Sequence, residues 1–170
     1  MTALADTLTQ HLEPPLPADP KQFMRDLLQP LAEERQRNIQ LVFKDLPRGT
    51  ASGLWLCFPE ADMIVVEDNT TPLHQMVILG HEIWHMVAGG GCRGHQVPAG
   101  AKAAARSFDE TLDRVMAART DFALQEEKDA EAFGLRLASR LRPYLTGAQA
   151  QMPLGGVTSR LQASFGGPAA

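Results

Sequence analysis

The sequence predicts an α+β fold in which a small antiparallel sheet of three strands packs against helices. Residues 39–43 alternate apolar and polar side chains, and residues 54–58 and 63–66 form two short apolar runs, as strands do. Apolar residues then recur at helical spacing from about residue 72 onward. Because the strands precede most of the helices, we expect the two kinds of element to segregate.

Composition and charge restrict the class of protein. The chain has 170 residues, of which 44% are hydrophobic and 21% charged, so one folded domain with a buried core is expected. The 16 Lys and Arg against 20 Asp and Glu give a net charge of −4, which argues against direct nucleic-acid binding through bulk positive charge. Arg35, Arg37, Lys44 and Arg48 are interpreted as a solvated face.

The cysteines and the N-terminus bear on location. With only Cys57 and Cys92, a disulfide scaffold and a four-cysteine zinc ribbon are excluded. The first residues lack the basic leader of a secretory signal, and no apolar run approaches the ~18 residues of a membrane span. We therefore expect a cytoplasmic protein with reduced thiols and no membrane span.

The chain divides into three parts. Residues 1–20 contain four prolines and are expected to form an extended N-terminal segment. Residues 21–145 are expected to form the folded domain. Residues 146–170 are rich in Gly, Ala, Gln and Pro, and we expect a flexible C-terminal tail.

Turn and cap residues order the elements of the first half of the domain. A helix follows Pro20, and Pro30 kinks or ends it. Turn chemistry in the sequence PEAD predicts a hairpin over 54–66. The next helix has a Thr cap with Pro72 at its first position, and the run that starts at Gly89 ends it.

Two further helices are expected in the second half. A charged helix is predicted over about 109–118. A long helix is predicted over roughly 121–141, with Pro143 ending it.

The chemistry centres on the motif HExxH, formed by His81, Glu82 and His85. Positions four apart share one face of a helix, so the two imidazoles converge on one point. Neutral imidazole nitrogens suit Zn²⁺. Glu82 lies beside them, where it can act as general base for a water that attacks a carbonyl and then protonate the leaving amine. The motif therefore predicts a zinc-dependent hydrolase.

A catalytic zinc site needs a third protein ligand. The metzincin pattern is excluded, because it requires Gly at position 88 and His at position 91, where this chain has Ala88 and Gly91. Cys92 and His95 are possible ligands only if the loop that carries them folds back over the metal.

The last helix is the better source of the third ligand. Glu126 and Glu127 flank its apolar stripe on opposite sides, so periodicity leaves the choice between them open. Glu131 lies one turn beyond Glu127, where it could hydrogen-bond a zinc-ligating histidine from behind. His74 precedes His81 by two turns on the same face and could line the cleft.

Two segments together resemble the ImmA/IrrE family of metallopeptidase domains: TTPLHQMVILGHEIWHMVAGG and EKDAEAFGLRLASRL. That family couples an HExxH helix to a later helix of the form E-x-x-A-(N/D)-x-F-A. Here the second motif is matched from Glu127 to Gly134, with Glu131 at the Asn or Asp position and Gly134 in place of Ala. The lead-in SGLWLCFPEADMIVVEDNTTP is similar to the family's hairpin, and the resemblance covers roughly 22–142.

The resemblance implies a zincin-like fold and a set of site residues. It places the zinc ligands at His81, His85 and Glu127, and the catalytic glutamate at Glu82. It also implies an intracellular zinc metallopeptidase that cleaves or controls a partner transcriptional regulator, of helix-turn-helix type, in repressor or toxin–antitoxin-like pairs. An extended peptide would bind by strand addition to the hairpin's edge strand.

The alternative is a zinc-binding regulatory or toxin-like protein that acts by binding and not by proteolysis. Glu82 weighs against it, because a purely structural site needs no base and closes its fourth coordination position.

Overall fold

We describe the protein from a computed structural model covering residues 2–10, 12, 19–47, 51–88 and 124–150, with the side chains of 146–150 left aside. The α+β class is confirmed. The predicted helix over 109–118 and the predicted ligands Cys92 and His95 lie outside the described residues, as does most of the predicted C-terminal tail. The elements, in chain order, are α1 (Thr2–Thr9), α2 (Pro20–Leu27), α3 (Gln29–Arg35), β1 (Asn38–Lys44), β2 (Gly53–Cys57), β3 (Ala61–Glu67), α4 (Pro72–Ala88) and α7 (Leu124–Ala150).

The sheet is mixed, so the prediction of an antiparallel sheet was wrong in one of its two pairings. The strand order is β1-β3-β2. β2 and β3 form the predicted antiparallel hairpin, with Trp55 opposite Ile64. β1 pairs with the far side of β3 in parallel, with Leu41 opposite Ile64.

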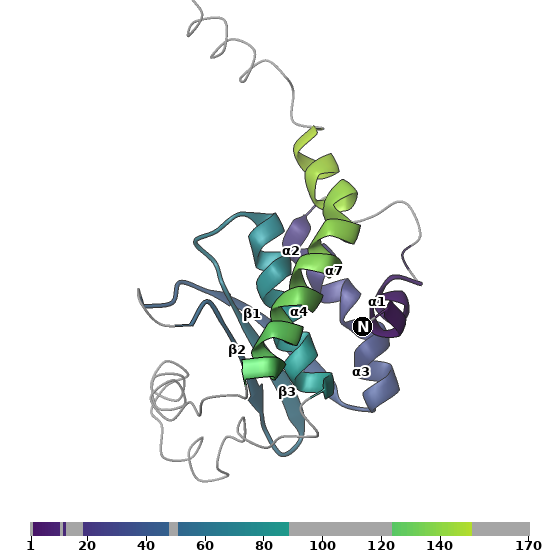
Figure 1. Cartoon of the computed structure of the whole chain (residues 1–170), viewed down its shortest axis with the longest axis vertical. Helices are drawn as coiled ribbons and strands as arrows, with labels where there is room; N and C mark the ends of the chain where they lie inside the picture. Colours follow the sequence, from purple (N-terminus) through teal and green to yellow (C-terminus); the bar gives the residue numbers. More distant parts are fainter. Residues whose placement is uncertain (1, 11, 13–18, 48–50, 89–123, 151–170) are drawn as a thin grey trace, which may run out of the picture.

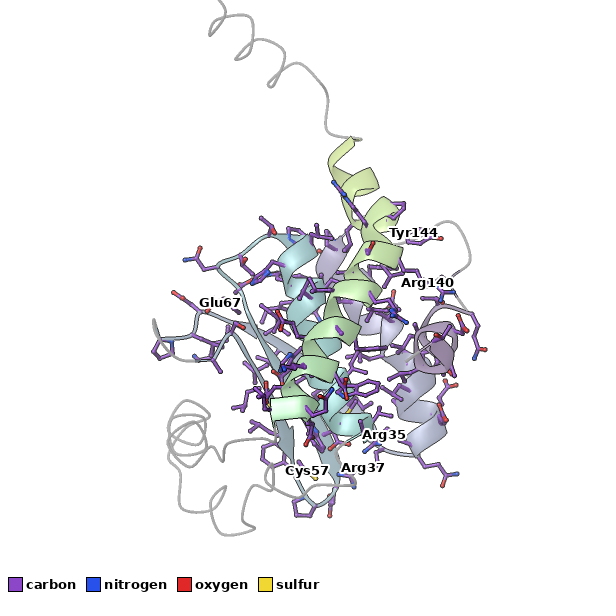
Figure 2. All side chains as sticks on the ribbon, viewed as in Figure 1. Arg35, Arg37, Cys57, Glu67, Arg140 and Tyr144 are labelled. Carbon is purple, nitrogen blue, oxygen red and sulfur yellow. The ribbon has the colours of Figure 1, made fainter. Side chains whose placement is uncertain are left out.

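A short crossing connection explains the parallel pair. The chain leaves β1 and enters β2 at the same end of the sheet, so it only has to cross the end of β3. Two parallel neighbours that follow each other in the chain usually need a long crossover. Here the chain goes from β1 to β2, which runs the opposite way, and reaches β3 only afterwards through the hairpin. Glu67, at the end of β3, holds the crossing chain because its Oε2 accepts a hydrogen bond from the amide of Leu46, at 3.0 Å (Figure 2).

The main core lies between the helices and one face of the sheet. Strand residues that point to this face are buried together with the inner faces of α2, α4 and α7. Large side chains at its centre are Trp55, Ile64, Phe23, Leu79 and Phe133. The opposite face of β2 and β3 carries a smaller buried cluster: Leu46, Leu54, Leu56 and Val65.

Pro30 separates α2 from α3, as the sequence predicts. α2 ends at Leu27, and Pro30 occupies the first turn of α3, where its missing amide hydrogen costs nothing. The expectation of a wholly extended segment before residue 20 was wrong for residues Thr2–Thr9, which form α1. Ala5 and Leu8 of α1 are buried, so tertiary packing holds this helix.

α7 continues through Pro143, which corrects the predicted end of this helix and the predicted start of the tail at residue 146. A proline inside a helix costs roughly 3 kcal/mol because it removes a backbone hydrogen bond. Packing on both sides of it offsets this cost: Leu141 and Leu145 are buried, and the Tyr144 ring lies 6.0 Å from that of Phe23 (Figure 2). The end of α7 projects past the other elements (Figure 1).

Two basic residues that were interpreted as a solvated face bind a buried acid instead. Asp62 is fully buried, and its Oδ2 lies 3.0 Å from Nε of Arg37 and 3.7 Å from an Arg35 nitrogen. Arg37 also donates to the carbonyls of Phe58 and Pro59 in the hairpin turn (Figure 2). These contacts fix the end of the sheet.

Cys57, the last residue of β2, is buried and disulfide-bonded, so the expectation of reduced thiols was wrong for this residue. None of the helices in the described ranges has an apolar stretch that could cross a bilayer.

Candidate metal centre

α4 carries the HExxH motif in its C-terminal half. The predicted cap is present, because Thr71 Oγ1 accepts a hydrogen bond from the amide of His74 and Pro72 opens the helix. Ile78, Leu79 and Ile83 are buried against the core. This burial fixes the rotation of the helix about its axis.

α7 packs against α4 in the opposite direction, through two glycines (Figure 1). A Cβ placed on Gly80 would lie 2.8 Å from Cα of Gly134. One placed on Gly134 would lie 3.2 Å from the amide nitrogen of His81 and closer still to the carbonyl oxygen of Val77. The two backbones therefore touch beside the motif, and a side chain at position 80 or 134 would hold them apart.

This close packing brings the predicted ligands together. His81, His85 and Glu127 each offer an atom within 4.8 Å of the others. The Nε2 atoms of the two histidines are 3.0 Å apart, and the Glu127 carboxylate oxygens lie 3.4 Å from Nε2 of His81 and 3.5 Å from Nε2 of His85.

These separations suit a tetrahedral ion. Zinc bonds of about 2.0–2.1 Å place ligand atoms roughly 3.4 Å apart, close to the distance between the two histidine nitrogens and to the distances from Oε2 and Oε1 of Glu127 to His81 and His85. His85 is fully buried, whereas the side chains of His81 and Glu127 are 22% and 37% exposed. One side of the triangle therefore faces outward, where a fourth ligand would have to enter.

The structure separates the two glutamates that periodicity could not. Glu127 contacts Nε2 of both histidines, whereas Glu126 reaches only His85, with its Oε1 3.5 Å from Nδ1. The two neighbouring residues of α7 thus approach opposite nitrogens of one imidazole ring. A carboxylate that hydrogen-bonds the far nitrogen orients an imidazole toward a metal, and Glu126, at 3.5 Å from Nδ1, lies on that side of His85.

The sheet holds Glu82 through a backbone amide. It is buried, and its Oε2 accepts a hydrogen bond of 2.9 Å from the backbone amide of Trp55 in β2. β2 is an edge strand, and this amide donates to Glu82 and not to β3. Gly53 makes the approach possible, because a Cβ there would lie 2.9 Å from Oε1 of Glu82 and closer to Ile78.

Asp62 supports this arrangement from behind the strand. Its Oδ1 accepts a hydrogen bond of 3.0 Å from the Trp55 indole nitrogen, and its Oδ2 accepts one from Arg37. The residue whose backbone holds Glu82 is thereby fixed through its side chain. The sequence analysis missed Asp62 and Arg37, because no spacing rule links positions 25 residues apart.

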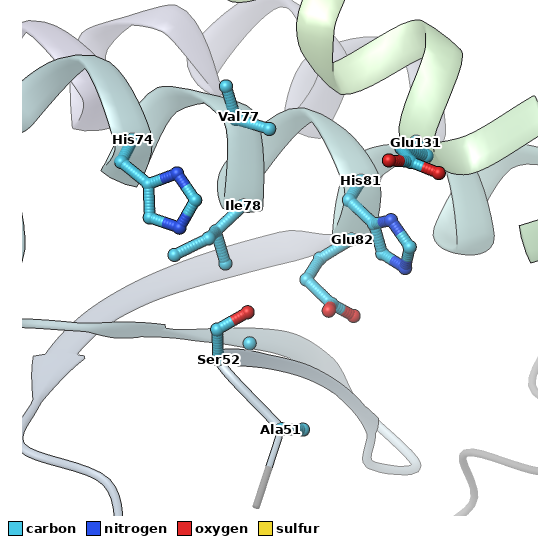
Figure 3. Close-up of a pocket in the computed structure, with 9 residues that line it drawn as sticks. Ala51, Ser52, His74, Val77, Ile78, His81, Glu82 and Glu131 are labelled. Carbon is cyan, nitrogen blue, oxygen red and sulfur yellow. The ribbon is translucent and has the colours of Figure 1, made fainter. Parts of the chain in front are cut away.

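A pocket of about 190 Å³ opens beside the triangle (Figure 3). It extends along α4 from His81 and Glu82 to His74, with Ser52 across from Ile78. His74 thus lines the cleft, as predicted. Glu131 also lines it, and none of the described contacts joins Glu131 to a histidine.

Comparison with protein-family models, with curated proteins and with solved structures found no match.

Proposed function

We propose that this chain is a zinc-dependent peptidase. One observation carries the proposal: a triangle of two imidazole nitrogens and a carboxylate lies next to a buried glutamate that belongs to the same HExxH motif. A site that only stabilised the fold would close all four coordination positions. Here His81 and Glu127 are partly exposed, so a substrate carbonyl has access.

His81, His85 and Glu127 would hold the ion. Bound zinc supplies Lewis-acid polarisation of the scissile carbonyl and makes a water more acidic. Nitrogen and carboxylate donors at tetrahedral separations fit this ion.

Glu82 carries the proton in this proposal. Its carboxylate takes a proton from the attacking water as the water oxygen bonds to the carbonyl carbon. When the C–N bond breaks, the same proton passes from Glu82 to the departing nitrogen. The hydrogen bond from the Trp55 amide to Oε2 holds this carboxylate in place.

The substrate proposed from the resemblance to the ImmA/IrrE family is a partner transcriptional regulator of helix-turn-helix type. Binding of an extended peptide by strand addition stays a prediction: β2 is the hairpin's edge strand, but its residues are buried and its Trp55 amide is taken by Glu82. The cytoplasmic location expected from the sequence stays a prediction, and the disulfide of Cys57 counts against it because disulfides persist in oxidising compartments.

The test measures metal and hydrolysis separately. Zinc content is determined by plasma mass spectrometry on wild type, Glu127→Ala and the control Asp129→Ala, purified without added metal. Asp129 lies on the same helix, is half-buried and accepts a hydrogen bond from Gln125. We expect about one zinc per chain in the wild type and the control, and its loss in Glu127→Ala.

Hydrolysis is then measured on a peptide pool from a digested proteome, with Glu82→Gln as the variant. Loss of a general base should lower the rate about 10²–10⁴-fold while zinc is retained. Cleavage undiminished in Glu82→Gln would contradict the mechanism. Zinc bound without any hydrolysis would favour the alternative, a zinc-containing protein that acts by binding.

A further inference from the structure

The pocket next to the triangle has the size of a site for one amino-acid side chain. Its volume is about 190 Å³, below the roughly 300–1,000 Å³ of pockets for drug-sized ligands. It begins at His81 and Glu82, so whatever fills it lies next to the reacting bond of a bound peptide (Figure 3).

The lining of the pocket is apolar along one wall and acidic at one end. Val77 and Ile78 of α4 form the apolar wall, and Ser52 lies across from it. Glu131 enters from α7 near His81, and Glu82 contributes the second carboxylate. No lysine or arginine is among the described residues that line the pocket.

Glu131 differs from Glu82 in what holds it. The Glu82 carboxylate accepts a hydrogen bond from the Trp55 amide. Within the described part of the chain, Glu131 forms no ion pair or hydrogen bond and is exposed, so its charge is available to a ligand. A long cationic side chain could lay its methylene groups along Val77 and Ile78 and place its charge near Glu131.

From this lining we infer that the pocket selects peptides with Lys or Arg beside the bond that is cleaved, and that Glu131 is the specificity residue. This inference rests on the proposed peptidase function. His74 closes the far end of the pocket, away from Glu131. An acidic side chain in the pocket would be repelled by the carboxylates of Glu82 and Glu131.

The test compares cleavage sites in a proteome-derived peptide pool for the zinc-loaded wild type, Glu131→Gln and Asp129→Asn. The control removes the same charge from the same exposed helix, two residues away and outside the pocket. Matched synthetic peptides with Lys or its uncharged analogue norleucine at the selected position then give the ratio of kcat/KM values.

We expect the wild type and Asp129→Asn to prefer Lys or Arg, and Glu131→Gln to lower the Lys-to-norleucine ratio about fivefold, the upper range for a solvent-exposed ion pair. Glu131→Lys should shift the preference toward Asp and Glu.

Cleavage without a basic preference, or a preference that Glu131→Gln leaves unchanged, would overturn the specificity inference while the peptidase function stands. If zinc-loaded wild type cuts no peptide in the pool, the peptidase function fails and the inference falls with it.

Discussion

The two halves of α4 differ in how their site side chains are held. The C-terminal half carries His81, Glu82 and His85, and the N-terminal half carries His74. In the C-terminal half, a group from another element contacts each motif residue: Glu127 contacts His81 and His85, and the Trp55 amide binds Glu82. In the N-terminal half, the described contacts of His74 involve only its backbone, and its ring lines an open pocket. In the proposed mechanism, metal binding and proton transfer would thus depend on pre-positioned groups, whereas recognition would be left to side chains that can adapt.

The largest expected difference between the halves is in zinc affinity. His81→Ala removes a ligand and should raise the zinc dissociation constant by at least about 100-fold, given what each ligand contributes to protein zinc sites. His74→Ala, two turns away on the same helix, should change it by less than about threefold, because His74 is outside the triangle. Competition titration with a chromophoric chelator measures both constants. Equal losses would show that the halves do not differ as described.

A second prediction concerns the contact between α4 and α7, which brings the two histidines and Glu127 together. Gly134→Ala adds helix propensity of about 1 kcal/mol, but the methyl group meets backbone atoms of α4 that cannot rotate away. Overpacking of this kind costs about 1–3 kcal/mol, so we expect a net loss of up to about 2 kcal/mol in the free energy of unfolding. Urea denaturation measures it, with Ser139→Ala on the exposed side of α7 as control. A stabilised Gly134→Ala would contradict the close packing.

The role of Glu126 can be separated from that of Glu127. Glu126→Ala should weaken zinc binding about tenfold, since it removes the carboxylate beside Nδ1 of His85 but no ligand. The Co²⁺-substituted protein should keep a tetrahedral absorption spectrum, which Glu127→Ala would lose. Gln125→Ala is the control on the same helix. Unchanged affinity in Glu126→Ala would mean that His85 is oriented by its burial alone.

The smallest effect is expected behind the sheet. Arg37→Lys keeps the charge near Asp62 but loses the donors that reach Phe58 and Pro59. We expect a loss of about 1 kcal/mol in stability, the size of a typical hydrogen-bond contribution. Thermal unfolding measures it, with the exposed Arg136→Lys as control. A loss of stability in Arg37→Lys but not in Arg136→Lys would support the conclusion that Arg37, through Asp62, anchors Trp55.

Local signals predicted local features. The Thr71 cap, the hairpin and the helix break at Pro30 follow from neighbouring residues, and all three are present. Pro143 misled the prediction because the sequence shows the cost of a helical proline but not the packing of Leu145 and Tyr144 that offsets it.

The sequence pattern could not predict features that depend on residues far apart in the chain. Alternation identified β1 as a strand but carries no information on its partner, and the parallel pairing with β3 was missed. Spacing put His81 and His85 on one face, yet choosing between Glu126 and Glu127 required the relative placement of α4 and α7. That placement depends on backbone contact at Gly80 and Gly134.

The parallel pairing of β1 with β3 has a consequence for the order of folding. A hairpin such as β2–β3 closes on its own in about 1–10 μs. β1 can pair only once β3 is available, because this partner strand lies beyond β2 in the sequence. On a ribosome, the emerging chain would therefore hold β1 without a partner until β3 has been synthesised.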